Sequence, residues 1–348
     1  SQINFAPTSH YASLDIASGA TLNNLSTGVI DLHTSMVSNS ISGSGTINNA
    51  GSITKTLNGA TAQTVSIDPT FNNQVGGSVD VQSGTLLFTK GNTDAVNAPD
   101  AGHYSVAAGA TLQFAGGVRK ITGNVTGAGN LVFSGGTGTD YDLAGTYDIT
   151  GSTTASFNHY TNATLDFIGT VSSIGTSYTQ SGVNTTVTFQ SVPTLSNLAS
   201  IGSVDGNTSF STGTSFPALT TLSKTASGTL DFANANLNLT SYTQTGGTVT
   251  GTGTVTIPSG GTFTWGGGTL GGAGILSTVQ GSTTHLNGGS TYLGAGRTWN
   301  NASQINFAPT SHYASLDIAS GATLNNLSTG VIDLHTSMVS NSISGSGT

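Results

Sequence analysis

A segment of 46 residues occurs twice in this chain without a single difference. Residues 1–46 read SQINFAPTSHYASLDIASGATLNNLSTGVIDLHTSMVSNSISGSGT, and residues 303–348 repeat them letter for letter. Two copies that occupied different places in one globular fold would have diverged in sequence. We therefore interpret residues 1–302 as one repeat unit and residues 303–348 as the start of the next identical unit. On this view the chain comes from a longer array joined head to tail; the alternative is that the duplication was introduced deliberately.

A shorter period runs inside the large one. Pairs of adjacent asparagines begin at Asn23, Asn48, Asn72, Asn300 and Asn325. At both ends of the chain neighbouring pairs recur about every 25 residues, a period typical of solenoids. If each interval is one turn of a coil, these side chains stack on one another. We expect them to form a turn ladder.

Phenylalanines recur at a similar spacing, often at the end of a phrase that runs Thr, aliphatic residue, any residue, Phe. They are Phe88, Phe114, Phe133, Phe167, Phe189, Phe210 and Phe232. The longest interval, from Phe133 to Phe167, corresponds to two turns if Ile149 takes the vacant place. We expect these rings to form one ladder inside the core.

Short alternating strands punctuated by glycine at such a period are typical of a parallel β-helix. Strands of successive turns pair about 4.8 Å apart, so equivalent side chains form columns. The sequence therefore predicts an all-β fold, a parallel β-solenoid of about 20–25 residues per turn that runs continuously over residues 1–348. A string of immunoglobulin-like sandwiches is the alternative, but such domains lack a sustained short period. No hinge, charge block or shift in composition divides the chain.

The charge content excludes several functions. Only 6% of the residues are charged, against about 25% in an ordinary soluble domain, and the chain has six Lys and Arg, a pI near 4.9 and no Cys. So few cations give no electrostatic footprint for nucleic acid. No apolar run approaches the roughly 18 residues of a membrane span. Without cysteine there is neither a disulfide framework nor thiolate chemistry.

One acidic cluster offers candidate chemistry. Asp140 and Asp142 flank Tyr141, so both would project from the same face of a strand, and Arg119 and Lys120 lie about one turn earlier. Glycoside hydrolysis uses two such carboxylates, and Ca²⁺ binds six to eight oxygens. The simpler interpretation is an exposed ion pair between adjacent turns, worth about 0–1 kcal/mol. We favour it, and expect no catalytic or cofactor site; Asp140 and Asp142 are the candidates if a metal binds.

Several phrases resemble a known group of proteins. SGATLNN at residues 18–24, GTINNAG at 45–51 and GTVTI at 253–257 are similar to the filamentous-haemagglutinin-type and autotransporter-type surface proteins of bacteria. The resemblance implies a right-handed coil, secretion, and an extracellular or cell-surface place as an adhesin, fibre or coat. It implies no particular site residues.

We therefore expect a structural, non-catalytic segment of a giant repetitive extracellular fibre, sheath or adhesin shaft. Its partners would be neighbouring repeats head to tail, with lateral association of rods or binding to cell-surface glycans as further options. The alternative is a carbohydrate-binding or carbohydrate-cleaving β-helix of the spike or lyase type. In that alternative Trp265 would stack on a sugar ring and the aspartates would lie in a groove.

Overall fold

The computed structural model describes residues 1–5, 13–34, 39–57, 63–92, 99–159, 162–307, 313–334 and 340–348. Over these residues all regular structure is β-strand, with no helix. The chain forms two compact units: Ser1–Tyr178 with Thr185–Ser191, and Thr179–Asn184 with Val192–Thr348. We call them unit 1 and unit 2 and describe each by itself.

Unit 1 consists of strands that coil around one interior and lie on three sides of it. The first side holds β1 (Gln2–Phe5), β4 (Val29–Thr34), β7 (Ser52–Leu57), β10 (Ser78–Val81), β12 (His103–Val106), β15 (Val125–Gly127), β18 (Tyr147–Ile149) and β21 (Val171–Ile174). The second side holds β2 (Ser13–Ile16), β5 (Asn39–Gly43), β8 (Thr64–Ile67), β11 (Thr85–Phe88), β13 (Thr111–Ala115), β16 (Asn130–Gly135) and β19 (Ser152–Phe157). The third side holds β3 (Thr21–Asn24), β6 (Thr46–Asn49) and β9 (Thr70–Asn73), and then β14 (Val118–Ile121), β17 (Asp140–Leu143), β20 (Thr164–Phe167) and β23 (Thr186–Phe189). The division between the units falls inside β22 (Ser177–Ser181).

Unit 2 is built in the same way from three sheets. One contains β24 (Ser200–Val204), β26 (Thr221–Lys224), β29 (Ser241–Gln244), β32 (Thr262–Trp265), β35 (Thr283–Leu286), β38 (Gln304–Phe307) and β41 (Val331–Asp333). Another contains β25 (Asn207–Phe210), β27 (Thr229–Asp231), β30 (Thr248–Thr250), β33 (Gly268–Leu270), β36 (Gly289–Leu293), β39 (Ala314–Ile318) and β42 (Ser342–Gly345). The last contains β28 (Leu237–Asn238), β31 (Thr254–Ile257), β34 (Ile275–Thr278), β37 (Thr298–Asn301) and β40 (Thr323–Asn326).

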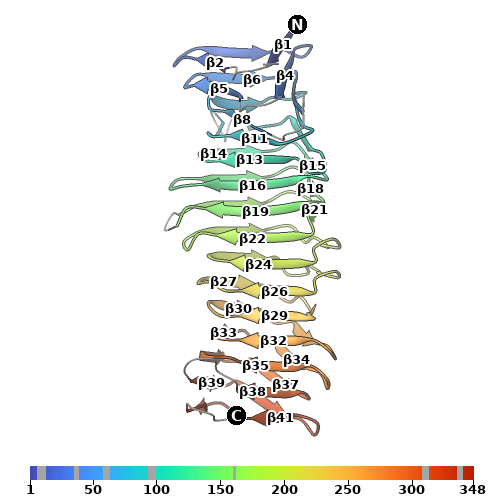
Figure 1. Ribbon diagram of the computed structural model, residues 1–348, viewed down its shortest axis with the longest axis vertical. Helices are drawn as coiled ribbons and strands as arrows, with labels where there is room; N and C mark the ends of the chain where they lie inside the picture. Colours follow the sequence, from blue (N-terminus) through green and yellow to red (C-terminus); the bar gives the residue numbers. More distant parts are fainter. Residues whose placement is uncertain are drawn as a thin grey trace. The chain divides into compact units, whose positions relative to one another are not determined.

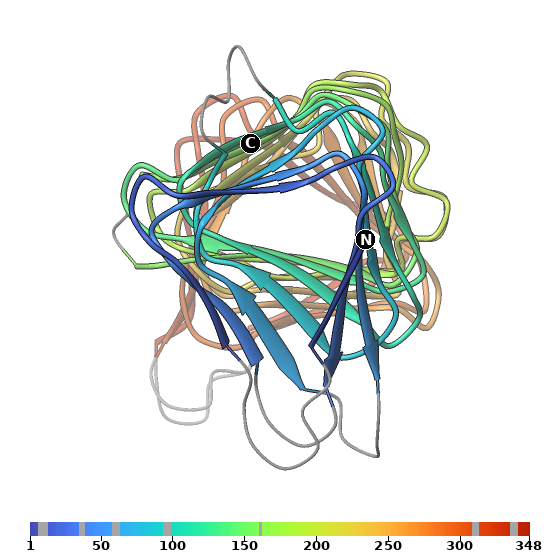
Figure 2. The same cartoon turned by 90° about the horizontal axis from the view of Figure 1, so that it is seen from above.

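In each unit, consecutive strands belong to different sheets, and a strand pairs in parallel with the strand one circuit later, except where a sheet ends (Figure 1). Viewed along the stack, the strands of unit 1 lie over one another around an interior that side chains fill (Figure 2). The predicted parallel β-solenoid is thus confirmed in each unit. Its circuits differ in length: a short one leads from Leu237 to its partner Val255, and a long one from Gln304 to its partner Val331. The range of circuit lengths is wider than predicted because the connections between the short strands differ in length.

Alternation along each strand decides which side chains form the core. In β8, Val65 and Ile67 are buried while Thr64 and Ser66 are half-buried on the outside. Successive side chains of a strand point to opposite faces, so one apolar residue in two is enough to fill the interior. This explains how a chain that is only 35% hydrophobic builds a continuous core.

Glycines stack at one corner of unit 1. A Cβ on Gly145 would lie 2.0 Å from the carbonyl oxygen of Gly123, and one on Gly169 would lie 2.1 Å from that of Gly145. Gly123 meets Gly102 in the same way, at 1.9 Å. A side chain at this corner would therefore collide with the backbone of the preceding turn. Close approach of successive turns requires glycine here.

Candidate functional site

The phenylalanines predicted to form the core ladder are all buried. Phe88, Phe114 and Phe133 hold paired positions on β11, β13 and β16. Their ring centroids are 5.7 and 5.9 Å apart, in stacked arrangements. The residue paired with Phe133 on the next turn is Ala155, which ends the column.

The remaining phenylalanines lie elsewhere. Phe167 and Phe189 pair on β20 and β23, on the third side of unit 1, with parallel rings 4.4 Å apart. In unit 2, Phe210 and Phe232 stack at 5.7 Å. The single ladder we predicted is therefore wrong, and Ile149, in β18 on the first side, does not fill its gap. Spacing along the sequence fixes a position around the coil only if all circuits have the same length, and these do not.

The predicted asparagine ladder forms, but in strands rather than turns. Asn23, Asn48 and Asn72 occupy paired positions of β3, β6 and β9. Asn48 Nδ2 donates to Asn23 Oδ1 at 2.9 Å, and Asn72 Nδ2 donates to Asn48 Oδ1 at 2.8 Å. In unit 2, Asn325 Nδ2 donates to Asn300 Oδ1 at 2.8 Å between β40 and β37. An amide carries both a donor and an acceptor, so identical side chains satisfy one another along a stack.

A second asparagine ladder, not predicted, runs on the inside. Asn24 Nδ2 donates to Asn49 Oδ1 at 2.7 Å, and Asn49 Nδ2 donates to Asn73 Oδ1 at 2.9 Å. The same amides also reach across the corner to backbone carbonyls, of Ser52 for Asn24 and of Ser78 for Asn49, both at 3.1 Å. The second member of each Asn-Asn pair thus binds both the next asparagine of its ladder and a backbone carbonyl at the corner.

The candidate carboxylates lie on the outside of unit 1. Lys120, Asp142 and Asp166 hold paired positions on β14, β17 and β20, which places opposite charges on adjacent turns. Asp140 accepts a hydrogen bond from Thr164 Oγ1. Partial burial raises the pKa of Asp142, the negative charges of Asp140 and Asp166 raise it further, and Lys120 opposes the shift. Both predicted aspartates are therefore together on one face.

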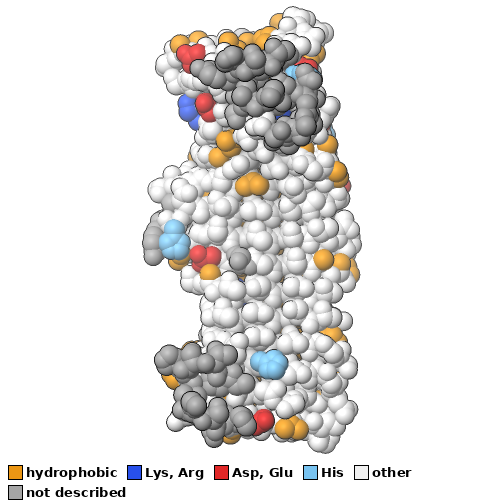
Figure 3. Space-filling model, in the orientation of Figure 1, with side chains coloured by type: hydrophobic (Ala, Val, Ile, Leu, Met, Phe, Trp, Pro, Cys, Tyr) orange, Lys and Arg blue, Asp and Glu red, His pale blue; other side chains and the backbone are white. Residues whose placement is uncertain are grey.

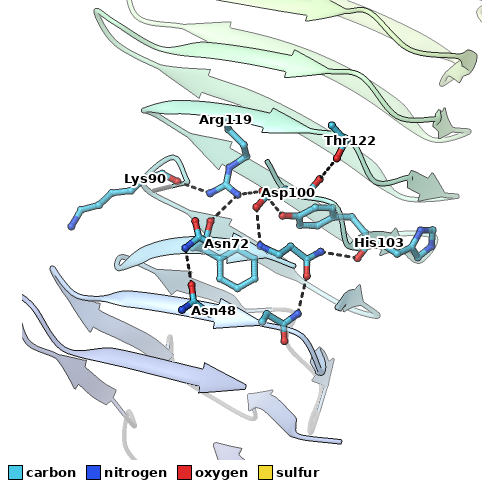
Figure 4. A network of polar contacts seen from close by, with 11 residues as sticks. Asn48, Asn72, Lys90, Asp100, His103, Arg119 and Thr122 are labelled. Atoms are coloured by element: carbon cyan, nitrogen blue, oxygen red, sulfur yellow. Dashed lines mark hydrogen bonds and ion pairs between the residues drawn. The ribbon is translucent and has the colours of Figure 1, made fainter. Parts of the chain in front are cut away.

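Arg119 does not join them, which corrects our expectation that it would be exposed. Its side chain turns inward and forms an ion pair with Asp100, and both side chains are fully buried (Figure 4). Arg119 Nη1 also donates to the carbonyl of Phe71 at 3.3 Å, and Nη2 donates to that of Lys90 at 2.7 Å. The guanidinium therefore links turns that lie up to 48 residues apart in the sequence.

Aromatic rings surround this ion pair. The guanidinium carbon lies 5.4 Å from the ring centroid of Phe88 and 5.0 Å from that of Phe114, within the range of cation–π attraction. Tyr104 donates to Asp100 at 2.8 Å, and the backbone N–H of Asn73 donates to the other carboxylate oxygen at 2.8 Å. Burial lowers the pKa of Arg119, but the charge and hydrogen bond of Asp100, together with Tyr104 and Tyr141, outweigh it, and the net shift is upward.

Two other buried cations, Lys224 and Arg297, likewise bind backbone carbonyls at corners of unit 2, and we call such side chains corner clamps. Lys224 Nζ donates to the carbonyls of Val204 at 2.8 Å and Ser227 at 2.6 Å. Arg297 Nε donates to Gly271 at 3.0 Å, and Nη2 donates to Gly251, one circuit further away, at 3.3 Å. Backbone carbonyl oxygens at these corners thus supply the hydrogen-bond acceptors that a buried cation needs.

As a result, the outside carries very few positive charges. With Lys55 also buried, four of the six Lys and Arg side chains lie inside, which leaves Lys90 and Lys120 on the surface. The face drawn in Figure 3 is covered mainly by uncharged polar side chains and backbone, with scattered charges. The burial of these cations was not predicted from the sequence. Where the neighbouring residues are Thr, Ser and Gly, the sequence does not indicate which face of the strand a charged side chain occupies.

The two copies of the duplicated segment take the same structure over their described residues. Gln2 pairs with Val29 and Gln304 pairs with Val331, which are equivalent positions. Likewise Ser13 pairs with Ser40, and Ser315 with Ser342. The turn hydrogen bond from Gly45 N to Ile16 O, 2.8 Å, recurs from Gly347 N to Ile318 O at 2.9 Å. The segment therefore folds in one way in two units.

What differs between the copies is which edge is covered. Ile3 is 38% exposed, whereas its equivalent Ile305 is fully buried and pairs with Thr284 of β35. Conversely, Leu32 is fully buried and pairs with Lys55 of β7, whereas its equivalent Leu334 is 45% exposed. Each copy thus exposes, at its open edge, side chains that the other copy buries. We regard these two open edges as the candidate functional site.

Neither a metal-binding cluster nor a membrane-spanning helix occurs among the residues that the structure describes. Those residues include no group of three or more His, Asp or Glu that could hold a metal ion. Within the same ranges no helix is long and apolar enough to cross a membrane. Trp265, the predicted sugar platform, is fully buried and donates its indole N–H to Gly267 O at 3.1 Å. No family model, curated protein or solved structure matches the chain.

Proposed function

We propose that this chain is a structural segment of a long extracellular fibre, sheath or adhesin shaft, in which repeat units equivalent to positions 1–302 join head to tail. The observation that carries the proposal is the complementarity of the two copies. A side chain exposed at one open edge, such as Ile3, is buried at the equivalent position of the other copy, Ile305, by the turn that precedes it. The sequence itself therefore specifies what covers each edge.

Stacking of this kind needs no binding site in the usual sense. Each turn presents a row of backbone N–H and C=O groups to the next turn, and a turn with an Asn-Asn pair adds an asparagine amide from each ladder. Such an edge pairs readily with another strand unless it is covered. A neighbouring unit would cover it with the same hydrogen bonds and the same apolar contacts. Mechanical continuity is then the function.

The outer surface supports a passive role. Its side chains are mainly Thr, Ser and Asn, and its cations are largely withdrawn into the interior as corner clamps. Such a surface offers little for specific electrostatic recognition. The proposed place outside the cell rests on the resemblance to bacterial surface proteins.

Carbohydrate cleavage is the second candidate, and one observation favours it. Asp142 has a raised pKa next to the carboxylates of Asp140 and Asp166, a pattern that glycosidases use for their acid. The predicted partners of such a site are missing from its face, because Arg119 and Trp265 lie in the interior. Incubation of polysaccharides with the chain and with Asp142→Asn tests this candidate: cleavage that the substitution abolishes would establish it.

Labelling decides the structural proposal. Antibodies raised against the chain are applied to intact source cells and followed by electron microscopy. We expect labelled filaments or a labelled coat at the cell surface. Label confined to the cell interior, or spread over soluble material, would contradict the proposal.

A further inference from the structure

We infer that the two copies of the duplicated segment are interchangeable between molecules, so that residues 303–348 of one chain can replace residues 1–46 of another. The partner is a second copy of this chain. The inference deepens the proposed function and rests on it, because it uses the same stacking of turns. It adds a route by which separate chains join into one solenoid.

The open edge of unit 2 shows what would bind there. In copy 1, β3 pairs with β6, with Asn23 opposite Asn48, and β5 pairs with β8, with Ile41 opposite Ile67. In copy 2, the equivalent strands β40 and β42 end their sheets. The natural cover for β40 and β42 is therefore the segment that contains β6, β7 and β8, supplied by another chain.

In that second chain the same segment is already covered, by its own copy 1. Copy 1 holds it through the hydrogen bonds Asn24 to Asn49 and Asn48 to Asn23. Copy 2 carries identical residues, Asn326 and Asn325, on an identical backbone path. The incoming copy can therefore form every contact that the resident copy forms, so binding takes place by displacement.

Simple end-to-end contact does not offer the same fit. It would place the edge of β40 against the edge of β3, and these are two copies of one strand. Neither strand meets an equivalent of itself within the units: β3 pairs with β6, and β40 pairs with β37. Exchange instead pairs β40 of one chain with β6 of the other, which is the pairing that β3 and β6 show within unit 1.

The energetic balance makes the exchange reversible. The incoming copy replaces the contacts of the resident copy with β6, β7 and β8 by identical contacts, while the displaced copy gives up its internal pairs, β1 with β4 and β2 with β5. The displaced segment regains its conformational freedom, and terminal turns are the parts of a fold that open most easily. Exchange of identical elements between protomers is a low-cost route to assembly. We therefore expect an equilibrium that depends on chain concentration.

Cross-linking of the full-length chain tests this inference, because the natural chain has no cysteine. One preparation carries Asn325→Cys and a second carries Asn48→Cys, and the two are mixed and treated with an oxidant or a short thiol cross-linker. Asn23 and Asn48 are paired residues, so exchange brings position 325 of one chain opposite position 48 of the other. Two further preparations, Asn23→Cys and Asn72→Cys, serve as matched partners on the same ladder.

Exchange predicts a cross-linked dimer of Asn325→Cys with Asn48→Cys. This dimer should be about tenfold more abundant than the dimer with Asn23→Cys or with Asn72→Cys, because a disulfide needs Cα atoms within about 7 Å. A synthetic peptide of residues 1–46 in excess should suppress it. Preferential linkage to Asn23→Cys would show simple end contact and overturn the inference, and so would equal linkage to all three. Failure here leaves covalent head-to-tail stacking untouched, because hydrogen exchange in a chain extended beyond Thr348 tests that stacking separately.

Discussion

Ile41 and Ile343 are the same residue of the duplicated segment, yet Ile41 is fully buried and Ile343 is 39% exposed. The backbone around them is the same, since Leu14 pairs with Ile41 and Leu316 with Ile343. The difference is the next turn: Ile41 pairs with Ile67 of β8, whereas β42 ends its sheet. Burial in this fold is therefore supplied by the neighbouring turn.

This pair provides a matched test of side-chain burial. We expect Ile41→Ala to destabilise unit 1 by about 2–5 kcal/mol, because it removes a packed core side chain. Ile343→Ala should cost less than about 1 kcal/mol, since 39% of the residue is already exposed and β42 ends its sheet. Amide hydrogen exchange and denaturant unfolding measure both. The order should reverse for Ile3→Ala and Ile305→Ala, and equal costs in either pair would contradict the account.

The buried ion pair gives a second prediction. Asp100→Asn should destabilise unit 1 by about 3–5 kcal/mol, because it leaves the Arg119 guanidinium uncompensated in the interior. The double variant Arg119→Met with Asp100→Asn should recover much of that loss. Asp15→Asn, at an exposed position, is the control and should change the unfolding free energy by no more than about 0.5 kcal/mol. A double variant as unstable as the sum of its single changes would rule out the ion pair as the cause.

Alkaline pH should weaken unit 1 through Tyr141. Burial raises the pKa of Tyr141 to about 12, above the ordinary value of about 10. Between pH 10 and 12 the folded state keeps a proton that the unfolded state has lost, so stability present below pH 10 declines as the pH rises.

Tyr141→Phe isolates this contribution. Near pH 8 the variant should be less stable, since it loses the hydrogen bonds from Tyr141 Oη to Ser134 O, 2.8 Å, and from Gly116 N to Tyr141 Oη, 2.6 Å. Urea unfolding at a series of pH values should show the gap between the two proteins narrowing from pH 10 to 12. A gap that stays constant over that range would refute the assignment.

The glycine corner gives a fourth prediction. Gly145→Ala should destabilise unit 1 strongly, because its Cβ would lie 2.0 Å from the carbonyl oxygen of Gly123. Gly202→Ala, in the middle of β24, is the matched control. Its Cβ would have no neighbour closer than 4.0 Å, so it should stabilise unit 2 by about 0.5–1 kcal/mol. Thermal unfolding of both variants distinguishes close backbone approach from glycine content as such.

The fold was predictable because its signals repeat. Alternation and the period of the Asn-Asn pairs indicate parallel stacked turns, and the structure contains them. The side of the coil that each residue takes was less predictable: Ala155 follows Phe133 in its column and Phe167 lies on another sheet, because circuits vary in length. Arg119 was predicted to be exposed, because its sequence neighbours do not indicate that Asp100 and three aromatic rings contact it in the interior.

The open edges could be inferred from the sequence only in part. The duplication predicts that units join, but which side chains of the segment face which neighbour depends on register. The structure supplies the register because it shows the segment in two settings. In copy 2, β38 pairs with the preceding turn through β35, and in copy 1, β4 pairs with the following turn through β7. No pattern of residue types within two identical segments could have distinguished these two environments.

Head-to-tail stacking is tested most directly by a chain extended beyond Thr348 with a second copy of residues 47–92. Hydrogen exchange of β42 (Ser342–Gly345) is measured before and after the extension, with β5 (Asn39–Gly43) as the internal standard. We expect the amides of β42 to become as protected as those of β5, because the added turn covers them as β8 covers β5. Amides of β42 that remain as fast to exchange as in the chain of 348 residues would contradict the account.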